Sequence, residues 1–224
     1  MEQVRVDNDK KARHSWYLYD FGNSAYAAIV LLAVYSAYFK NVVVGGAEGT
    51  RLWGISVGIA AILVAIMSPI FGTIADFTKS KKKILMVFTA MAIIFTALLF
   101  FVREGNVFFG MLFFILAEIG YRAEQVFYDA LLSDVSTPAS VNTVSGKGWA
   151  IGMFGSIIAL LVVLLPIQLM GNSVIPFAFL ITAAIYLLSS IPTFINVKEK
   201  QEPETLPPGT NVIVFALNKL LTTF

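Results

Sequence analysis

The chain has 224 residues, of which 13% are charged and 58% are hydrophobic, and its mean hydropathy is +0.79. Soluble domains carry about 25% charged residues, so this composition excludes an ordinary soluble domain and indicates a protein of the lipid bilayer. Cysteine is absent and His14 is the only histidine, which excludes disulfides, a thiolate or histidine metal centre, and a Ser-His-Asp triad. The net charge of +2 is not gathered into a basic stripe, so nucleic acid is not expected as a partner.

Long runs without charged residues organise the chain. A membrane helix needs about 20 apolar residues to cross roughly 30 Å of hydrocarbon. A polar leader over residues 1–15 lacks the features of a signal peptide, and the turn at 171–173 divides the last uncharged stretch in two. The sequence therefore predicts an all-α integral membrane protein with six transmembrane helices at about 17–39, 52–75, 84–102, 107–127, 147–170 and 174–197.

Two further segments follow this bundle, which occupies residues 16–197. Residues 198–210 form a polar, proline-rich linker. Residues 211–224 are apolar but too short to span a bilayer comfortably. We expect this last segment to be an amphipathic interfacial helix or the segment that precedes a seventh transmembrane helix.

The distribution of lysine and arginine predicts the orientation. Of the 16 Lys and Arg residues, 12 fall in the leader, in the loops after the second and fourth helices, and in the tail. Three fall in the loops on the other side, and Arg122 falls inside the fourth helix. Because cytoplasmic loops carry the excess of Lys and Arg, both termini are expected in the cytoplasm.

The six helices are consistent with two related triplets. Corresponding helices start roughly 90 residues apart, and a Gly-x-x-x-Gly pair opens both the second helix (Gly54, Gly58) and the fifth (Gly148, Gly152). Small residues four apart let helix backbones approach closely in lipid. The pattern favours a 3+3 inverted repeat, which is the half-unit of large secondary transporters, although glycine is also simply common in membrane helices.

Four stretches carry a family resemblance. Gly72-Thr-Ile-Ala-Asp76, followed by a basic turn, resembles the loop between helices 2 and 3 of the major facilitator superfamily. Residues 15–26, together with 127–134 and 145–152, resemble the vacuole-effluxer branch of that superfamily, the autophagy-related permeases and their bacterial relatives. Members typically have twelve helices in two halves, so the resemblance implies an N-terminal six-helix half, either a fragment or a truncated product.

Polar residues in the fourth helix are candidates for a substrate pathway. Ionisable side chains at bilayer depth are costly and often mark pathways or pairs. Glu118 falls near the midplane, Arg122 follows at i+4 on the same face, and Tyr121 and Gln125 lie beside them. Glu124 is expected nearer the cytoplasmic end, in contact with water. The alternative for the Glu118 and Arg122 pair is a self-satisfied ion pair that only fixes helix packing.

The first helix offers a second polar group, formed by Asp20, Asn23 and Tyr26. Asp20 and Asn23 share a face at i and i+3, and Gly22 between them weakens the helix. Polar groups beside a breakable turn are typical of transporter sites, whereas Asp20 can equally be a carboxylate near water at a helix N-terminus. The aromatic residues near helix ends, Tyr38, Trp53 and Trp149, are interpreted as an interfacial belt.

The loop between the second and third helices is a candidate gating loop. Asp76 can cap the turn or pair with a cation, and Gly72 permits close helix packing. The resemblance assigns the whole group to conformational gating. Its members are Gly72, Asp76, Lys79, Lys81 and Lys82.

These observations favour a secondary active transporter, or half of one, that moves a small polar solute by alternating access. The resemblance implies amino acids or similar metabolites as solute and a second six-helix half as partner. It implies efflux from the vacuole toward the cytoplasm in fungi and leaves the direction open in bacteria. The expected location is the cell (inner) membrane, or the vacuolar membrane in a fungus. The alternative is a non-transporting six-helix scaffold or a half-transporter that must dimerise. No nucleotide loop or catalytic motif is present in the sequence, so no enzyme activity and no cofactor are expected.

Overall fold

The structure is a computed structural model that describes residues 2–200, with side chains from residue 10 onward, and all of its regular elements are helices. The expected interfacial segment at 211–224 lies outside the described residues. Two π-helical segments continue the first helix, and short 3-10 turns flank two others. The elements in chain order are α1 (Glu2–Tyr26), η1 (Ala27–Ala33), α2 (Val34–Tyr38), η2 (Phe39–Val44), α3 (Gly46–Thr78), α4 (Lys81–Leu98), η3 (Leu99–Phe101), α5 (Val107–Ala130), α6 (Leu132–Val135), α7 (Val141–Met170), η4 (Asn172–Val174) and α8 (Ile175–Asn196).

Several helical segments are long and apolar enough to cross a bilayer, which makes the chain a multi-pass membrane protein. α5, with 24 residues, is long enough to span a bilayer but carries Glu118, Arg122 and Glu124 close together. These charges are the reason that α5 does not qualify as a membrane span by composition. The segments that qualify by length and composition are Lys10–Val44, Gly46–Thr78, Lys81–Phe101, Val141–Met170 and Asn172–Asn196.

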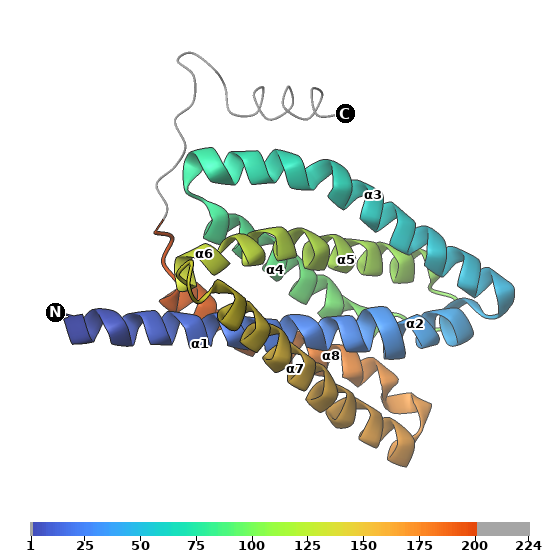
Figure 1. Cartoon of the computed structure of the whole chain (residues 1–224). Helices are drawn as coiled ribbons and strands as arrows, with labels where there is room; N and C mark the ends of the chain where they lie inside the picture. Colours follow the sequence, from blue (N-terminus) through green and yellow to red (C-terminus); the bar gives the residue numbers. More distant parts are fainter. Residues whose placement is uncertain (1, 201–224) are drawn as a thin grey trace.

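The long helices form two layers around α1 and α5 (Figure 1). α1 packs against α7 and α8, α5 packs against α3 and α4, and α4 also contacts α8. In the view of Figure 1, α1 and α5 lie side by side, α3 runs along the outer side of α5, α7 crosses in front of α1, and α4 and α8 lie behind. One face of the bundle is therefore built by α1 and α5, and the buried core lies between these two helices and the layer behind.

The helices extend beyond the expected apolar ranges at several ends. α1 already begins at Glu2, so part of the polar leader is helical, and α3 and α7 begin at Gly46 and Val141 instead of near 52 and 147. Hydropathy marks only the part of a helix that contacts lipid. A helix can continue into water wherever its backbone hydrogen bonds persist and no proline or glycine ends it.

The two Gly-x-x-x-Gly pairs differ in their packing. A Cβ atom built on Gly152 would lie 2.6 Å from Asp20 Oδ2, and one built on Gly155 would lie 2.8 Å from Phe21 Cα, so α7 approaches α1 closely. In contrast, no other part of the described chain lies within 4 Å of a Cβ placed on Gly54 or Gly58 of α3. Close packing therefore uses the glycines of α7, whereas those of α3 remain open.

Gly22 does not weaken the first helix as expected. α1 is continuous through this position to Tyr26, and a Cβ on Gly22 would lie 2.8 Å from Tyr186 Cα. The glycine is needed because α8 approaches at this point. The irregular backbone of the first helix lies further along, in the π-helical segment η1.

Candidate functional site

The charged pair expected on α5 forms inside the bundle. Arg122 Nε donates to Glu118 Oε1 at 2.6 Å, and Tyr26 Oη on α1 donates to Glu118 Oε2 at 3.1 Å. The Glu118 side chain is fully buried, whereas 36% of the Arg122 side chain is exposed. Arginine has five N–H donors, and only Nε is used in this contact. The outer part of the guanidinium is therefore available to an anionic group.

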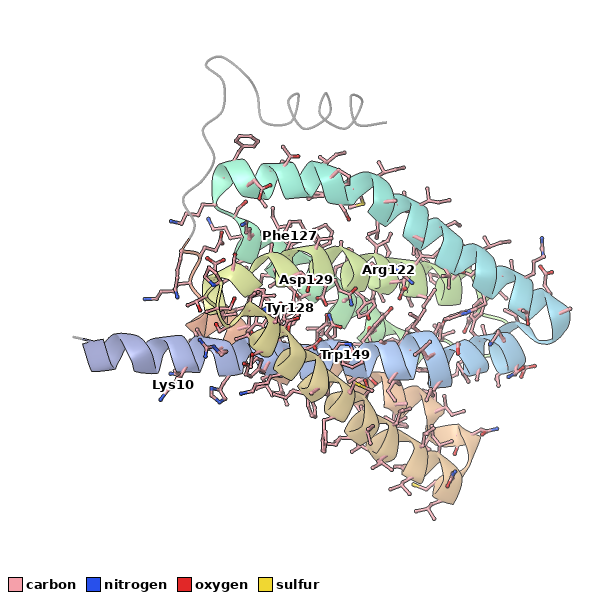
Figure 2. All side chains as sticks on the ribbon, viewed as in Figure 1. Lys10, Arg122, Phe127, Tyr128, Asp129 and Trp149 are labelled. Atoms are coloured by element: carbon pink, nitrogen blue, oxygen red, sulfur yellow. The ribbon has the colours of Figure 1, made fainter. Side chains whose placement is uncertain are left out.

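The other expected pathway residues of this cluster lie close to the pair. The Tyr26 ring is fully buried and stacks on the Tyr121 ring with 4.7 Å between centroids. Gln125, one turn further along α5, lines a pocket toward α1. In Figure 2, Arg122, Tyr128 and Asp129 lie along α5 where it faces α1. The structure thus brings Tyr26, Glu118, Tyr121 and Arg122 together.

Glu124 does not lie in water as expected, because its side chain is fully buried. Tyr19 Oη donates to Oε2 and Asn23 Nδ2 donates to Oε1, each at 2.5 Å, and Tyr186 Oη also donates to Oε1. These hydroxyl and amide donors replace water around the carboxylate, which explains how a charged side chain is accommodated here. Tyr19 also shares a 2.6 Å hydrogen bond with Thr89 of α4. Glu124 therefore connects α1, α5 and α8, and through Tyr19 also α4.

Asp20 and Asn23 share a face of α1 but have different surroundings. Asn23 is 2% exposed and binds Glu124, which places it in the core. Asp20 is less deeply buried, and it lines an open pocket of about 190 Å³ together with Asp129 of α5, a pocket that Asn23 also reaches. The remaining lining residues are Trp16, Asn23, Gln125, Tyr128, Ser145 and Trp149.

Aromatic residues support the floor of this pocket, which we call the acidic pocket. The rings of Trp16 and Tyr128 stack with 4.4 Å between centroids. Trp16 Nε1 donates to the Tyr128 carbonyl at 3.1 Å, and Tyr128 Oη donates to the Trp16 carbonyl at 3.2 Å. This reciprocal pair fixes α1 against α5 next to Asp20 and Asp129.

The interfacial-belt interpretation is wrong for one of its three aromatic residues. Tyr38 is buried, and its hydroxyl donates to the Val102 carbonyl at 3.1 Å. Trp53 is only partly buried and packs against Phe114 with 4.2 Å between ring centroids. Trp149 is 69% exposed. Tyr38 is buried because the extended first helix carries it between α8 and the end of α4.

The candidate gating loop is held mainly by Lys82 and by a glutamate from the end of the described chain. Lys82 Nζ donates to the carbonyls of Phe194 and Val197 at 3.2 and 2.8 Å, and so binds the C-terminal end of α8. Glu199 accepts the backbone N–H groups of Lys81 and Lys82 at 3.2 and 2.9 Å, and thereby caps α4.

Asp76, Lys79 and Gly72 complete the candidate gating loop. Lys81 Nζ lies 4.0 Å from Asp76 Oδ1, and the Asp76 side chain is 46% exposed. Lys79 adopts a left-handed backbone with φ 49° at the end of α3. The close helix packing expected at Gly72 is not found, since no other part of the described chain lies within 4 Å of a Cβ built there.

Sequence reasoning missed the partners of the buried carboxylate. Tyr19 and Tyr186 lie within apolar runs and are separated along the chain, so no local spacing connects them to Glu124. The available signal is that a tyrosine hydroxyl in an apolar helix needs a partner when it is buried. Among the described residues, no group of three or more His, Asp or Glu side chains is arranged to hold a metal ion.

Comparison with known proteins identifies relatives of the chain. The family described as "Vacuole effluxer Atg22 like" matches residues 52–224. An uncharacterized MFS-type transporter, YxiO, of Bacillus subtilis is 34% identical over 209 residues, which cover 86% of this chain and 49% of the relative. An uncharacterized protein of Aquifex aeolicus is 24% identical over 200 residues, which cover 88% of this chain and 48% of the relative. The chain thus spans about half the length of these curated relatives, and no solved structure matches it significantly.

Proposed function

The chain belongs to the vacuole effluxer Atg22-like family, and on this premise we propose that it is one half of a secondary active transporter for a small polar solute. The observation that carries the proposal is the Glu118–Arg122 pair on the face built by α1 and α5. Its carboxylate is fully buried, while its guanidinium is partly exposed. The guanidinium can therefore contact a solute on its exposed side, while the buried carboxylate holds it in place.

The proposed half has six transmembrane helices arranged as a 3+3 inverted repeat. α1 contacts α7 and α8, and α5 contacts α3 and α4. In the repeat, α1 would be equivalent to α5, α3 to α7 and α4 to α8. The contacts of α1 with α7 and α8 then match those of α5 with α3 and α4, and the α4–α8 contact joins two equivalent helices. Under this proposal α5 is the sixth span, because its charged residues have partners inside the bundle.

Alternating access requires a second six-helix half, supplied by the same chain in a longer protein or by another copy. Much of α3 and α7 is apolar and exposed in the described structure, and these helices pack against α5 and α1, respectively (Figure 1). A second half that covers them would enclose the Glu118–Arg122 pair and the acidic pocket. The alternatives are a half-transporter that dimerises and a non-transporting scaffold.

The proposed solute class is amino acids or similar metabolites, moved as efflux across the cell (inner) membrane, or the vacuolar membrane if the chain is fungal. The partly exposed guanidinium of Arg122 suits a carboxylate group. Asp20 and Asp129 in the acidic pocket suit an ammonium group. Both features lie between α5 and α1, and Gln125 is placed between them in the sequence of α5.

Reconstitution tests this function and separates the alternatives. Proteoliposomes that contain the chain, either alone or together with a second six-helix half, are loaded with a mixture of labelled amino acids, and the released solutes are measured. Release by the chain alone identifies a dimeric half-transporter, and release only with the second half identifies a two-half transporter. Absence of release in both preparations, with the protein shown to be folded, contradicts transport and leaves the scaffold.

A further inference from the structure

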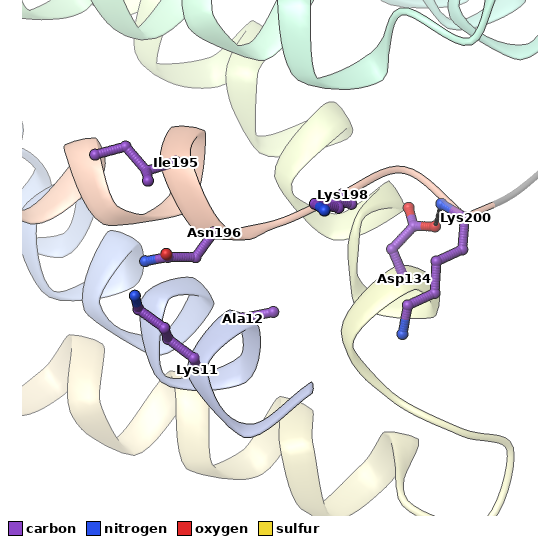
Figure 3. Close-up of a pocket in the computed structure, with 7 residues that line it drawn as sticks. All are labelled: Lys11, Ala12, Asp134, Ile195, Asn196, Lys198 and Lys200. Carbon is purple, nitrogen blue, oxygen red and sulfur yellow. Dashed lines mark hydrogen bonds between the residues drawn. The ribbon is translucent and has the colours of Figure 1, made fainter. Parts of the chain in front are cut away.

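A second pocket, of about 180 Å³, lies at the end of the bundle where α8 stops (Figure 3). Its walls come from α1, from α6, and from the end of α8 with the segment that follows it. In Figure 3, Lys11 and Asn196 lie on one side, and Lys200 with Asp134 lies on the other. The residues that line this basic pocket are Lys11, Ala12, Asp134, Ile195, Asn196, Lys198 and Lys200.

The walls of the basic pocket are fixed by specific contacts. Thr193 Oγ1 donates to the Ser15 carbonyl at 2.7 Å and Asn196 Nδ2 donates to Ser15 Oγ at 2.9 Å, which joins the end of α8 to α1. The backbone N–H of Lys200 donates to Asp134 Oδ1 at 2.7 Å, which joins the tail to α6. The pocket is therefore a built feature of three converging segments.

Side chains after α8 point alternately to opposite sides, and this places two lysines at the pocket. Residues 197–200 are not helical, and in an extended segment neighbouring side chains point to opposite sides. Glu199 turns to the N-terminus of α4, where it accepts two backbone N–H groups. Lys198 and Lys200 both line the pocket and face it together with Lys11.

The charge balance of the lining favours an anion. Three lysines line the pocket, and Asp134 is the one carboxylate among the lining residues. Asp134 is only 2% exposed and accepts the backbone N–H of Lys200, which compensates part of its charge. Lys11 and Lys198 are exposed, and lysine ammonium groups bind phosphate as compact point charges.

An apolar surface leads from this pocket along the membrane-spanning part of α8. Leu188, Ile191 and Ile195 are 68%, 41% and 69% exposed. Their spacing of three and four residues places them on one face of the helix, and Ile195 also lines the pocket. A ligand with an anionic head and an apolar tail matches both parts of this surface.

We propose that the basic pocket binds the phosphate headgroup of an anionic phospholipid, with an acyl chain along Leu188, Ile191 and Ile195. Basic pockets at the ends of membrane helices suit such headgroups, and each lysine near the surface contributes about 1 kcal/mol. The lipid would hold α1, α6 and the end of α8 together at the point where Lys82 and Glu199 join the gating loop to α8. This site is independent of the solute pathway.

Lipid titration of the purified chain in neutral detergent tests the proposal. Phosphatidylglycerol should raise the unfolding temperature more than phosphatidylcholine. Replacing Lys11, Lys198 and Lys200 by Gln should weaken phosphatidylglycerol binding roughly 100-fold, since the loss of about 3 kcal/mol corresponds to two factors of ten. A matched variant with the exposed Lys10, Lys83 and Lys147 replaced by Gln loses the same charge, none of it from the pocket lining, and should bind normally.

Two further arms decide the source of the phosphate. Ile195→Ser combined with Leu188→Ser should weaken binding of long-chain phosphatidylglycerol and leave its headgroup specificity intact. If inorganic phosphate stabilises the chain as well as the lipid does, the ligand is a free anion and the lipid assignment is overturned. Equal lipid binding by the pocket variant and the matched variant would overturn the site itself.

Discussion

Glu118 and Glu124 on α5 are both fully buried, but their charges are compensated in different ways. Glu118 has a cation at 2.6 Å. Glu124 instead accepts hydrogen bonds from neutral Tyr19, Asn23 and Tyr186. The first arrangement leaves part of a guanidinium for a solute, whereas the second consumes both carboxylate oxygens within the core. We therefore propose that Glu124 stabilises the bundle and that the Glu118–Arg122 pair belongs to the solute pathway.

Replacing Glu124 by an apolar residue should destabilise the chain, because buried donors lose their hydrogen-bond acceptor. Glu124→Leu leaves the donors of Asn23 and Tyr186 without their acceptor, whereas Tyr19 keeps Thr89 as a partner. Each unsatisfied buried group costs about 1–3 kcal/mol. Glu124→Gln keeps one acceptor oxygen and should have a smaller effect. Unfolding of the purified chain by SDS measures both, with the exposed Glu104→Leu as control. A Glu124→Leu variant as stable as the Glu104→Leu control would contradict the structural assignment.

Breaking the Glu118–Arg122 pair from one side should also cost stability. Arg122→Met leaves a buried carboxylate whose remaining described partner is Tyr26, and a partly exposed pair should lose about 1–3 kcal/mol. Glu118→Gln combined with Arg122→Met removes both charges and should recover much of this loss. Measuring transport by this folded double variant then separates the two roles of the pair. If the pair binds solute, the double variant should fold but should not transport. Normal transport by the double variant would restrict the pair to helix packing.

At the scale of the helices, the glycines of α7 and α3 should respond differently to substitution. Gly155→Ala places a Cβ against the backbone of Phe21, which cannot move aside as a flexible side chain could. Gly58→Ala meets no other described part of the chain and gains about 1 kcal/mol of helix propensity. Thermal unfolding in detergent should therefore show a clear loss for Gly155→Ala and none for Gly58→Ala. Equal losses in both variants would mean that α3 and α7 pack alike.

The apolar parts of the helices could be predicted from the sequence because lipid contact requires about 20 consecutive apolar residues. The Glu118–Arg122 pair could be predicted as well, since its spacing of four residues is local to one helix. The position of Glu124 could not, because its burial depends on Tyr186, which is 62 residues away, and on how α8 packs against α1. The helical start at Glu2 was missed because polar helices outside the membrane have no hydropathy signal.

At the scale of the whole molecule, the ends of the bundle differ in charge. The start of α1, the turn between α3 and α4, α6 and the end of α8 lie at one end (Figure 1). Lys11, Lys82 and Lys198 belong to this basic end, and the turns near Gly45, Gly105 and Gly171 lie at the other. From the positive-inside rule we expect the basic end to face the cytoplasm.

Single cysteines test this orientation directly, because the chain has no cysteine of its own. Ser80→Cys and Ser133→Cys lie at the basic end, and Ala47→Cys and Asn172→Cys lie at the opposite end, all in turns or near helix ends. A thiol reagent that cannot cross membranes should label only Ala47→Cys and Asn172→Cys in intact cells, and all four variants after the cells are opened. The labelling of all four in opened cells is the control for accessibility. Labelling of Ser80→Cys and Ser133→Cys in intact cells, with the other two protected, would reverse the orientation and place the basic pocket in the outer leaflet.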